Sequence, residues 1–357
     1  MSHKVLIIGL DGGTWKILRP MMEQGLMPNL RTLAENGASG TLRSTVPPVT
    51  VPAWASFQTG VNPGKHGLFD FQTFDPQSKQ VGIVSGHSLS LPTLWDLTAA
   101  AGKRVITINV PLTYPPKQDP NRITIGCMLS PREDPSLIYP PQLFDEVIAK
   151  QGYKVTAGPF QRRISMRLDK FVAEETEVET TRLAVARHLL LHQPWDLAMV
   201  HIQASDYLQH CCYPSLDPNC PDFDENEYLV VSRFYQTIDR EIARLLESLG
   251  QQPTLILLSD HGFKAVKRRI NINAWLRRQG WLVPSGPSAL GLAVQAVRKC
   301  DVLRLRTRLF VRLFRDFHRL RQLANTANTR AINWQATKAS MPVGTVFGAI
   351  FIQDGPE

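Results

Sequence analysis

Three apolar runs of the sequence each lead into an aspartate. Asp11 ends the run VLIIGLD, Asp206 lies just past LAMVHIQ, and Asp260 ends TLILLSD. In an open parallel sheet, ligands bind beyond the carboxyl ends of the strands, so polar side chains at those ends carry most functional weight. One carboxylate in such a place could simply cap the next helix, but three together favour a shared ligand site.

Two of these aspartates have a histidine close by. Asp206 and His210, in the segment DYLQH, are four residues apart and would share one face of a helix, where both can reach a single ion. Asp260 and His261 are adjacent at a strand-to-loop turn, where consecutive side chains can diverge to serve two ions or two sides of one. An isolated Asp–His pair is usually a surface feature. Two such sets after apolar strands indicate a metal centre.

A dense motif, TVPAWASFQTGVNPGKHG, runs from Thr50 to Gly67. Its part from Gly60 to His66 has three residues between the glycines and a histidine after the lysine, so it is not a phosphate-binding P-loop. Thr50 precedes an apparent helix, whose N-terminus would attract an anion. A threonine hydroxyl needs a base or a metal to remove its proton. Two ions roughly 4 Å apart can do this and stabilise the leaving oxygen at phosphorus.

The elements that must position these residues follow from the hydrophobic pattern. From Lys4 to about Leu258, short runs rich in Val and Ile alternate with segments of helical period, which predicts an α/β fold with a mostly parallel central sheet flanked by helices. The predicted strands are Val5–Leu10, Val81–Val84, Arg104–Val110, Ile123–Cys127, Leu197–Ile202 and Thr254–Leu258. The predicted helices are Leu94–Ala101, Gln142–Gln151, Lys170–Leu191 and Tyr228–Leu249.

Composition places the chain among ordinary globular proteins. It has 357 residues, 43% of them hydrophobic, which is enough for one large core or two medium ones. Its five cysteines lack paired C-x-x-C spacing, so we expect free thiols in a reducing compartment. The N-terminus is interpreted as a strand rather than a signal peptide, and no run of about eighteen apolar residues predicts a membrane span. A soluble, cytoplasmic protein is expected.

Past Gly262 the pattern changes. The elements predicted there are a short helix at Ile272–Leu282, a basic amphipathic helix including Val302–Leu323, and a last strand at Gly344–Ile352. Residues 298–330 hold ten Lys and Arg against two Asp, and so supply eight of the nine net positive charges. The first interpretation of this segment is a lid packed by its Leu and Phe side, and the alternative is binding to an anionic membrane surface. Nucleic-acid binding is disfavoured because base-stacking aromatics and a recognisable module are lacking.

Taken together, four motifs resemble the type I phosphodiesterase and nucleotide pyrophosphatase branch of the alkaline phosphatase superfamily. They are GLDGG at Gly9–Gly13, TVPAWASFQTGVNPGKHG at Thr50–Gly67, DYLQH at Asp206–His210 and SDHG at Ser259–Gly262. Their order and separation also fit, and the resemblance covers nearly the whole chain. It implies an alkaline phosphatase-like catalytic core at residues 1–290, an inserted basic helical segment at 291–332, and a return strand of the core at 333–357, with the core incomplete at its C-terminal side.

The resemblance also implies how the site is divided. The implied ligands are Asp11, Thr50, Asp260 and His261 for one ion, and Asp206, His210 and one further histidine for the other. Thr50 would form a covalent phospho-enzyme that water hydrolyses. Zinc is the expected ion, with manganese as the alternative. The implied enzyme is a hydrolase of phosphodiester or pyrophosphate bonds that acts on a small organic phosphate.

Two positions depart from the family pattern. Phe71 stands where the family's nucleotide pyrophosphatases have an Asn that binds a phosphoryl oxygen, and the preceding Asp70 cannot donate when ionised. The family's remaining histidine ligand follows the inserted region, whereas the only histidine after His261 in this chain is His318, which lies inside the basic segment and therefore in the wrong context. The alternatives are therefore phosphomonoester hydrolysis or phosphoryl transfer at the same site, or a truncated, non-catalytic relative. Sulfatases use a Cys or Ser nucleophile, so Thr50 argues against that chemistry.

Overall fold

The chain divides into two compact units in the computed structural model. The structure describes residues 3–250, 252–266, 268, 270–285, 332–342 and 350–352. One unit comprises Met1–Leu68 with Ser85–Ala265, and the second comprises Phe69–Val84 with Val266–Glu357. The predicted basic helix at Val302–Leu323 lies outside the described residues. The predicted domain boundaries at residues 290 and 332 stay predictions.

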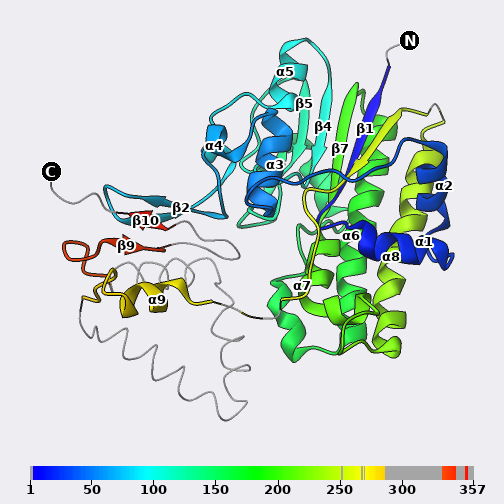
Figure 1. The fold of residues 1–357 in the computed structure, drawn as a ribbon. Coiled ribbons are helices and arrows are strands. Elements are labelled where there is room, and N and C mark those ends of the chain that lie inside the picture. Colours follow the sequence, from blue (N-terminus) through cyan, green and yellow to red (C-terminus); the bar gives the residue numbers. More distant parts are fainter. Residues whose placement is uncertain are drawn as a thin grey trace. The chain divides into compact units, whose positions relative to one another are not determined.

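The first unit is built on a six-stranded sheet in the order β6-β5-β4-β7-β1-β8 (Figure 1). Its strands are β1 Val5–Leu10, β4 Val105–Ile108, β5 Arg122–Ile125, β6 Ile138–Tyr139, β7 Leu197–Ile202 and β8 Thr254–Leu258. Neighbouring strands are parallel except for β5 and β6. The predicted α/β fold with a mostly parallel sheet is confirmed, and five of the six predicted strands lie in this sheet.

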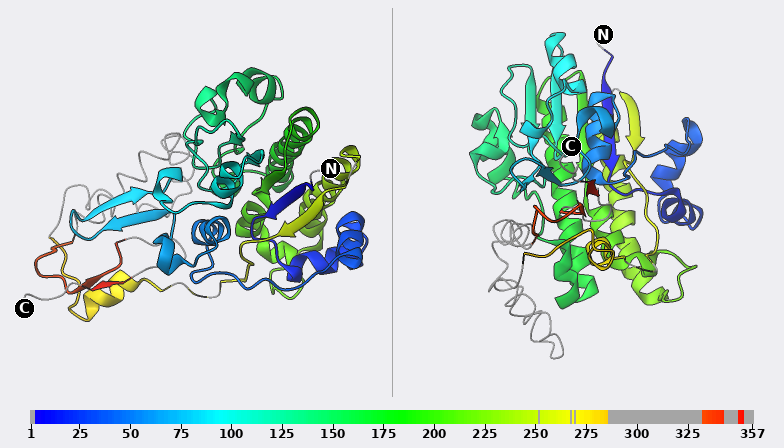
Figure 2. Two further views of the ribbon diagram at one scale, coloured as in Figure 1. Left: turned by 90° about the horizontal axis from the view of Figure 1, so that it is seen from above. Right: turned by 60° about the vertical axis from the view of Figure 1, so that its left-hand side comes forward.

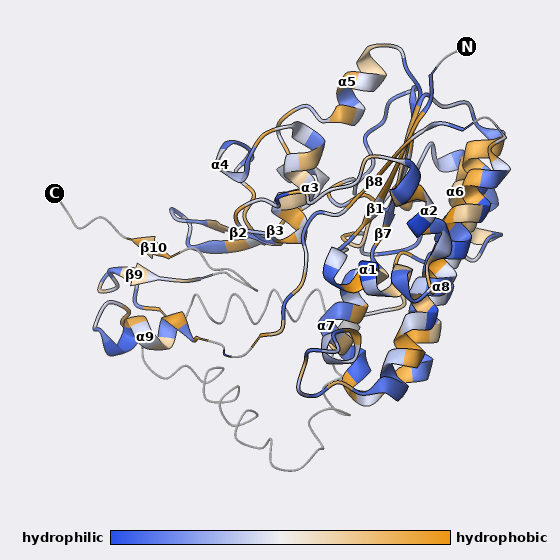
Figure 3. Ribbon diagram, turned by 45° about the vertical axis from the view of Figure 1, so that its right-hand side comes forward, coloured by the Kyte–Doolittle hydropathy of each residue, from blue (hydrophilic) through white to orange (hydrophobic). Residues whose placement is uncertain are grey.

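Strand β1 shows why this sheet carries helices on both faces (Figure 2). Leu6 and Ile8 join a core with apolar residues of α1, α2, α6, α7 and α8, whereas Ile7 packs with Trp54 of α3 and Trp95 of α5. Side chains alternate between the faces of a strand, and here both faces are apolar, as Figure 3 shows. The helices of this unit are α1 Trp15–Glu23, α2 Pro28–Asn36, α3 Thr50–Thr59, α4 Pro63–His66, α5 Leu94–Ala100, α6 Leu168–His192, α7 Ala204–Leu216 and α8 Glu225–Ser248.

Two local predictions were wrong. The predicted strand Val81–Val84 forms β3 Gln80–Ile83, which pairs antiparallel with β2 Gln72–Asp75 in the second unit and not with the central sheet. The Asp75 carboxylate closes this hairpin by accepting from the Gln77 backbone N–H and the Ser78 hydroxyl, which is local turn chemistry. The segment predicted as the α-helix Gln142–Gln151 is instead a 3-10 turn at Pro141–Leu143 followed by a π-helix at Phe144–Ala149.

The second unit combines this hairpin with elements from the C-terminal part of the chain. They are α9 Ile272–Arg278, β9 Ala339–Ser340 and β10 Phe351–Ile352, and β9 pairs antiparallel with β10. The Phe74 ring stacks on Trp334 and meets Phe351 edge-on, which joins the hairpin to these strands. The predicted last strand, Gly344–Ile352, is described only at residues 350–352. Among the described residues, no helix is both long and apolar enough to span a bilayer.

Gly9 of β1 leaves the space that the Trp54 ring occupies. A Cβ at Gly9 would lie 2.6 Å from a ring carbon of Trp54, and Trp54 is completely buried. We expect Gly9→Ala to lower the free energy of unfolding by about 1–3 kcal/mol because the overpacked ring cannot move aside. Urea unfolding measures this change. Gly40→Ala is the matched control, since no atom lies within 4 Å of its added Cβ; equal stability of the two variants would contradict the packing argument.

Candidate metal centre

The six predicted site residues all lie in the first unit, and all except Thr50 follow the carboxyl ends of neighbouring strands. Strands β7, β1 and β8 are adjacent in the sheet, so the segments that follow them meet at one edge. The residues are Asp11 after β1, Asp206 and His210 on α7 after β7, Asp260 and His261 after β8, and Thr50 as the first residue of α3. Segments far apart in the sequence are thereby brought to one place.

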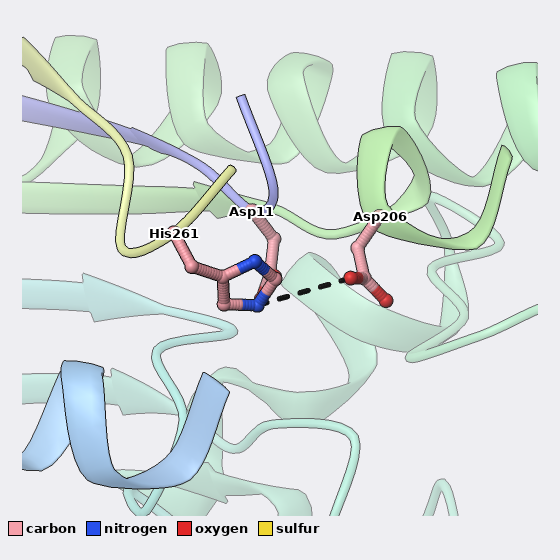
Figure 4. Close-up of side chains that lie close together, drawn as sticks. All are labelled: Asp11, Asp206 and His261. Carbon is pink, nitrogen blue, oxygen red and sulfur yellow. Dashed lines mark ion pairs between the residues drawn. The ribbon is translucent and has the colours of Figure 1, made fainter. Parts of the chain in front are cut away.

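The tightest group consists of Asp11, Asp206 and His261, whose ligand atoms lie within 4.8 Å of one another (Figure 4). His261 Nε2 lies 3.5 Å from Asp11 Oδ1, 3.9 Å from Asp206 Oδ1 and 3.3 Å from Asp260 Oδ2. His261 Nδ1 donates to the Gly262 carbonyl at 3.2 Å, so Nε2 of the neutral ring carries a lone pair. A lone pair that faces three carboxylates marks a position for a cation.

Thr50 and His210 extend this group on two sides. Thr50 Oγ1 lies 3.2 Å from His261 Nε2 and 3.5 Å from Asp11 Oδ1, so the hydroxyl borders the cation position. His210 Nε2 lies 3.4 Å from Asp206 Oδ2, one helical turn along α7, as the spacing of the DYLQH segment predicts. Asp206 therefore faces His210 through one oxygen and His261 through the other. The side chains of the two implied ligand sets therefore form one continuous cluster.

Burial makes the charge of this cluster costly. Asp11, Asp206 and Asp260 are 1%, 6% and 7% exposed. Burial, together with the nearby Asp11 charge, raises the pKa of Asp206 and of Asp260 well above the ordinary aspartate value. Burial is also the largest single influence on Asp11 and acts to raise its pKa, but His201, His261 and the hydrogen bond from Trp54 together outweigh burial, and the pKa of Asp11 is lowered. Among the described residues, no hydrogen bond or nearby charge outweighs burial in this way for Asp206 or Asp260.

Two buried oxygens of the cluster show that the implied metal ions fit these residues. Within the described part of the chain, Asp206 Oδ1 and Asp260 Oδ2 have no hydrogen-bond donor. Such an atom costs about 1–3 kcal/mol when left unpaired, and more when charged. Bound divalent ions would satisfy both oxygens, and a mixed carboxylate and imidazole set suits zinc and also accepts manganese. The resemblance implies one further histidine ligand. His318, the only histidine after His261, lies outside the described residues.

Sequence reasoning missed the donors that hold the acids in place. His201 Nε2 and Trp54 Nε1 both bond Asp11 Oδ2, at 2.9 Å and 3.3 Å. The Gly12 backbone N–H donates to Asp260 Oδ1 at 3.1 Å. One signal for His201 was available, because a histidine within the apolar strand LAMVHI has no hydrophobic reason to be there. Trp54 looks like an ordinary core residue, and nothing in the sequence distinguishes it.

The fold and this cluster define an α/β protein with a mostly parallel sheet and a centre of carboxylates and histidine at one edge of that sheet. The model of the family "Type I phosphodiesterase / nucleotide pyrophosphatase" matches residues 5–319, and the chain belongs to this family. Comparison with curated proteins gives no match.

Solved structures share the fold. Phosphonoacetate hydrolase from Sinorhizobium meliloti 1021, in complex with phosphonoformate, is 20% identical with a TM-score of 0.56, over 78% of this chain and 62% of that one. An inactive variant of murine ectonucleotide pyrophosphatase/phosphodiesterase 5 in complex with AMP is 17% identical with a TM-score of 0.50, over 80% of this chain and 64% of that one. The chain thus spans less than two thirds of the length of either structure. At 20% and 17% identity, these similarities show that the fold is shared and nothing more.

The metal-free protein should become less stable as the pH rises above 3.8, the ordinary value for aspartate. Because the pKa values of Asp206 and Asp260 are raised on folding, the folded chain binds more protons than the unfolded chain above that pH, and stability falls until the folded-state values are passed. Urea unfolding in EDTA between about pH 5 and 8 measures the slope. The double variant Asp206→Asn, Asp260→Asn should flatten it; an unchanged slope would contradict this assignment.

Proposed function

We propose that the protein is a metal-dependent phosphoester hydrolase of the phosphodiesterase or nucleotide pyrophosphatase type. Family membership supports this class of reaction. The observation that carries the proposal is the placement of the Thr50 hydroxyl, at the start of α3 and beside a group of buried acids, two of which keep an oxygen without a hydrogen-bond donor among the described residues. A nucleophile placed beside a cation position is what displacement at phosphorus requires.

The residues that would hold the ions are those implied by the motifs. They are Asp11, Thr50, Asp260 and His261 for one ion, and Asp206 with His210 for the other. When bound, the ions supply positive charge that favours the deprotonated Thr50 oxygen and offsets the charge on the phosphoryl group. We propose zinc as the ion, with manganese as the alternative.

The N-terminus of α3 gives the phosphoryl group a place to bind. Thr50 is the first residue of this ten-residue helix, and the N-cap residue Val49 has no side-chain hydrogen bond to the helix. First-turn N–H groups that no cap satisfies, together with the helix dipole, attract an anion. A phosphoryl group held there would lie against Thr50 Oγ1.

The Thr50 oxygen then carries the reaction in two displacements. After losing its proton, Thr50 Oγ1 forms a bond to phosphorus while the bond from phosphorus to the leaving oxygen breaks. The leaving oxygen keeps the electron pair and takes up a proton from water. A water molecule next attacks the phosphothreonine, which restores the Thr50 hydroxyl and releases the remaining phosphate product. The proposed substrates are small organic phosphates.

Two further proposals rest on the sequence alone. Residues 298–330 would form either a lid helix that packs by its Leu and Phe side or a contact with an anionic membrane surface. The protein would act in the cytoplasm.

Thr50→Ala should abolish turnover. Loss of the attacking oxygen should lower kcat for bis-p-nitrophenyl phosphate by roughly a thousandfold or more, measured with zinc or manganese present. Thr59→Ala is the matched control, because Thr59 lies at the other end of α3 and its hydroxyl donates to the Ala55 carbonyl. The control should keep wild-type turnover. Hydrolysis that persists in Thr50→Ala would rule out the proposed nucleophile.

A further inference from the structure

The two carboxylate oxygens of Asp11 have different surroundings. Oδ2 accepts from His201 Nε2 at 2.9 Å and from Trp54 Nε1 at 3.3 Å. Oδ1 lies 3.5 Å from both Thr50 Oγ1 and His261 Nε2. One oxygen is therefore held by two N–H groups of the protein, and the other faces the nucleophile and the candidate ligands.

Asn109 sets the tautomer of His201. Asn109 Nδ2 lies 3.2 Å from the His201 carbonyl oxygen, and since that oxygen can only accept, the nearby amide atom must be the NH2 group. The same nitrogen lies 3.3 Å from His201 Nδ1, which must then accept as well. The neutral imidazole consequently carries its hydrogen on Nε2, the atom that faces Asp11.

The fold holds this pair rigidly. Asn109 and His201 are both completely buried; Asn109 directly follows β4, and His201 lies in β7, the neighbouring strand. Asn109 adopts a positive φ of 59°, a conformation that Asn tolerates better than most residues. The Trp54 ring packs edge-on against the His201 imidazole, with centroids 5.0 Å apart, and fixes its plane. Burying two polar side chains is costly unless hydrogen bonds compensate, so a histidine within one apolar strand and an asparagine directly after another call for a role.

We propose that Asn109 and His201 form a positioning relay that makes Asp11 a one-oxygen metal ligand through Oδ1. This inference rests on the proposed metal-dependent function. Because Oδ2 is engaged by His201 and Trp54, Oδ1 is the Asp11 oxygen that would be left to hold an ion, and Oδ1 faces Thr50. His201 contacts no substrate in this role. It acts through Asp11, as hydrogen-bonded partners of metal ligands do.

Zinc affinity of His201 variants tests the relay. His201→Leu keeps a buried side chain of comparable size but removes the donor, and should weaken zinc binding about 10- to 100-fold. His201→Gln places an amide N–H near the position of Nε2 and should restore most of that affinity. Competition with a chromogenic chelator measures zinc affinity on the full chain. Urea unfolding in EDTA reports separately on packing in the metal-free protein.

The outcomes separate the relay from simple packing. Undiminished zinc affinity in His201→Leu would overturn the relay. It would also be overturned if His201→Leu and His201→Gln lost zinc affinity equally, in proportion to the stability that each loses in the metal-free protein. If His201→Leu does not fold, Asn109→Gly takes its place, because Gly accepts the positive φ while removing the amide. It should weaken zinc binding, and wild-type affinity would refute the relay.

Binding and turnover also distinguish this inference from the proposed function. Wild-type protein that binds zinc but hydrolyses no phosphoester would refute the hydrolase and leave the affinity test of the relay valid. Wild-type protein that binds no zinc or manganese would refute the relay itself.

Discussion

Three buried carboxylates that face one another need positive charge, and the surrounding chain supplies only part of it. Asp11 has two N–H donors on one oxygen, whereas Asp206 and Asp260 each keep a buried oxygen without a donor among the described residues. An arrangement of this kind opposes folding unless a cation completes it. The cluster is therefore explained as the set of protein ligands of a metal centre, and the residues around it position those ligands.

The sheet topology is what brings the acids together. The segment after β1 lies between those after β7 and β8 because these strands are adjacent and parallel, so three distant parts of the sequence end at one edge. Apolar side chains on both faces keep the sheet between helical layers and leave this edge as the place for polar groups. Gly9 also helps to position Asp11. Because Gly9 has no side chain, the Trp54 ring fits against β1, and its N–H donates to Asp11.

Much of the fold and of the candidate site could be predicted because both depend on short patterns of residues in the sequence. Short apolar runs rich in Val and Ile located five strands of the central sheet. Aspartates after three of these runs, with histidines at short spacing, identified residues that the fold does bring together. The strand predicted at Val81–Val84 was assigned to the wrong sheet because an apolar run does not reveal its partner strand. His201 was missed for a related reason: its role depends on Asn109 and Asp11, which are remote in sequence and meet it only in the folded sheet.

The central claim is that the buried acids form a divalent-cation site. A crystal of the protein grown with zinc, with anomalous diffraction recorded at the zinc edge, tests it directly. We expect zinc about 2.0–2.2 Å from Asp11 Oδ1 and from His261 Nε2, with Asp11 Oδ2 still bonded to His201. A map without zinc density between Asp11, Asp206 and His261, while zinc is bound elsewhere on the chain, would contradict it.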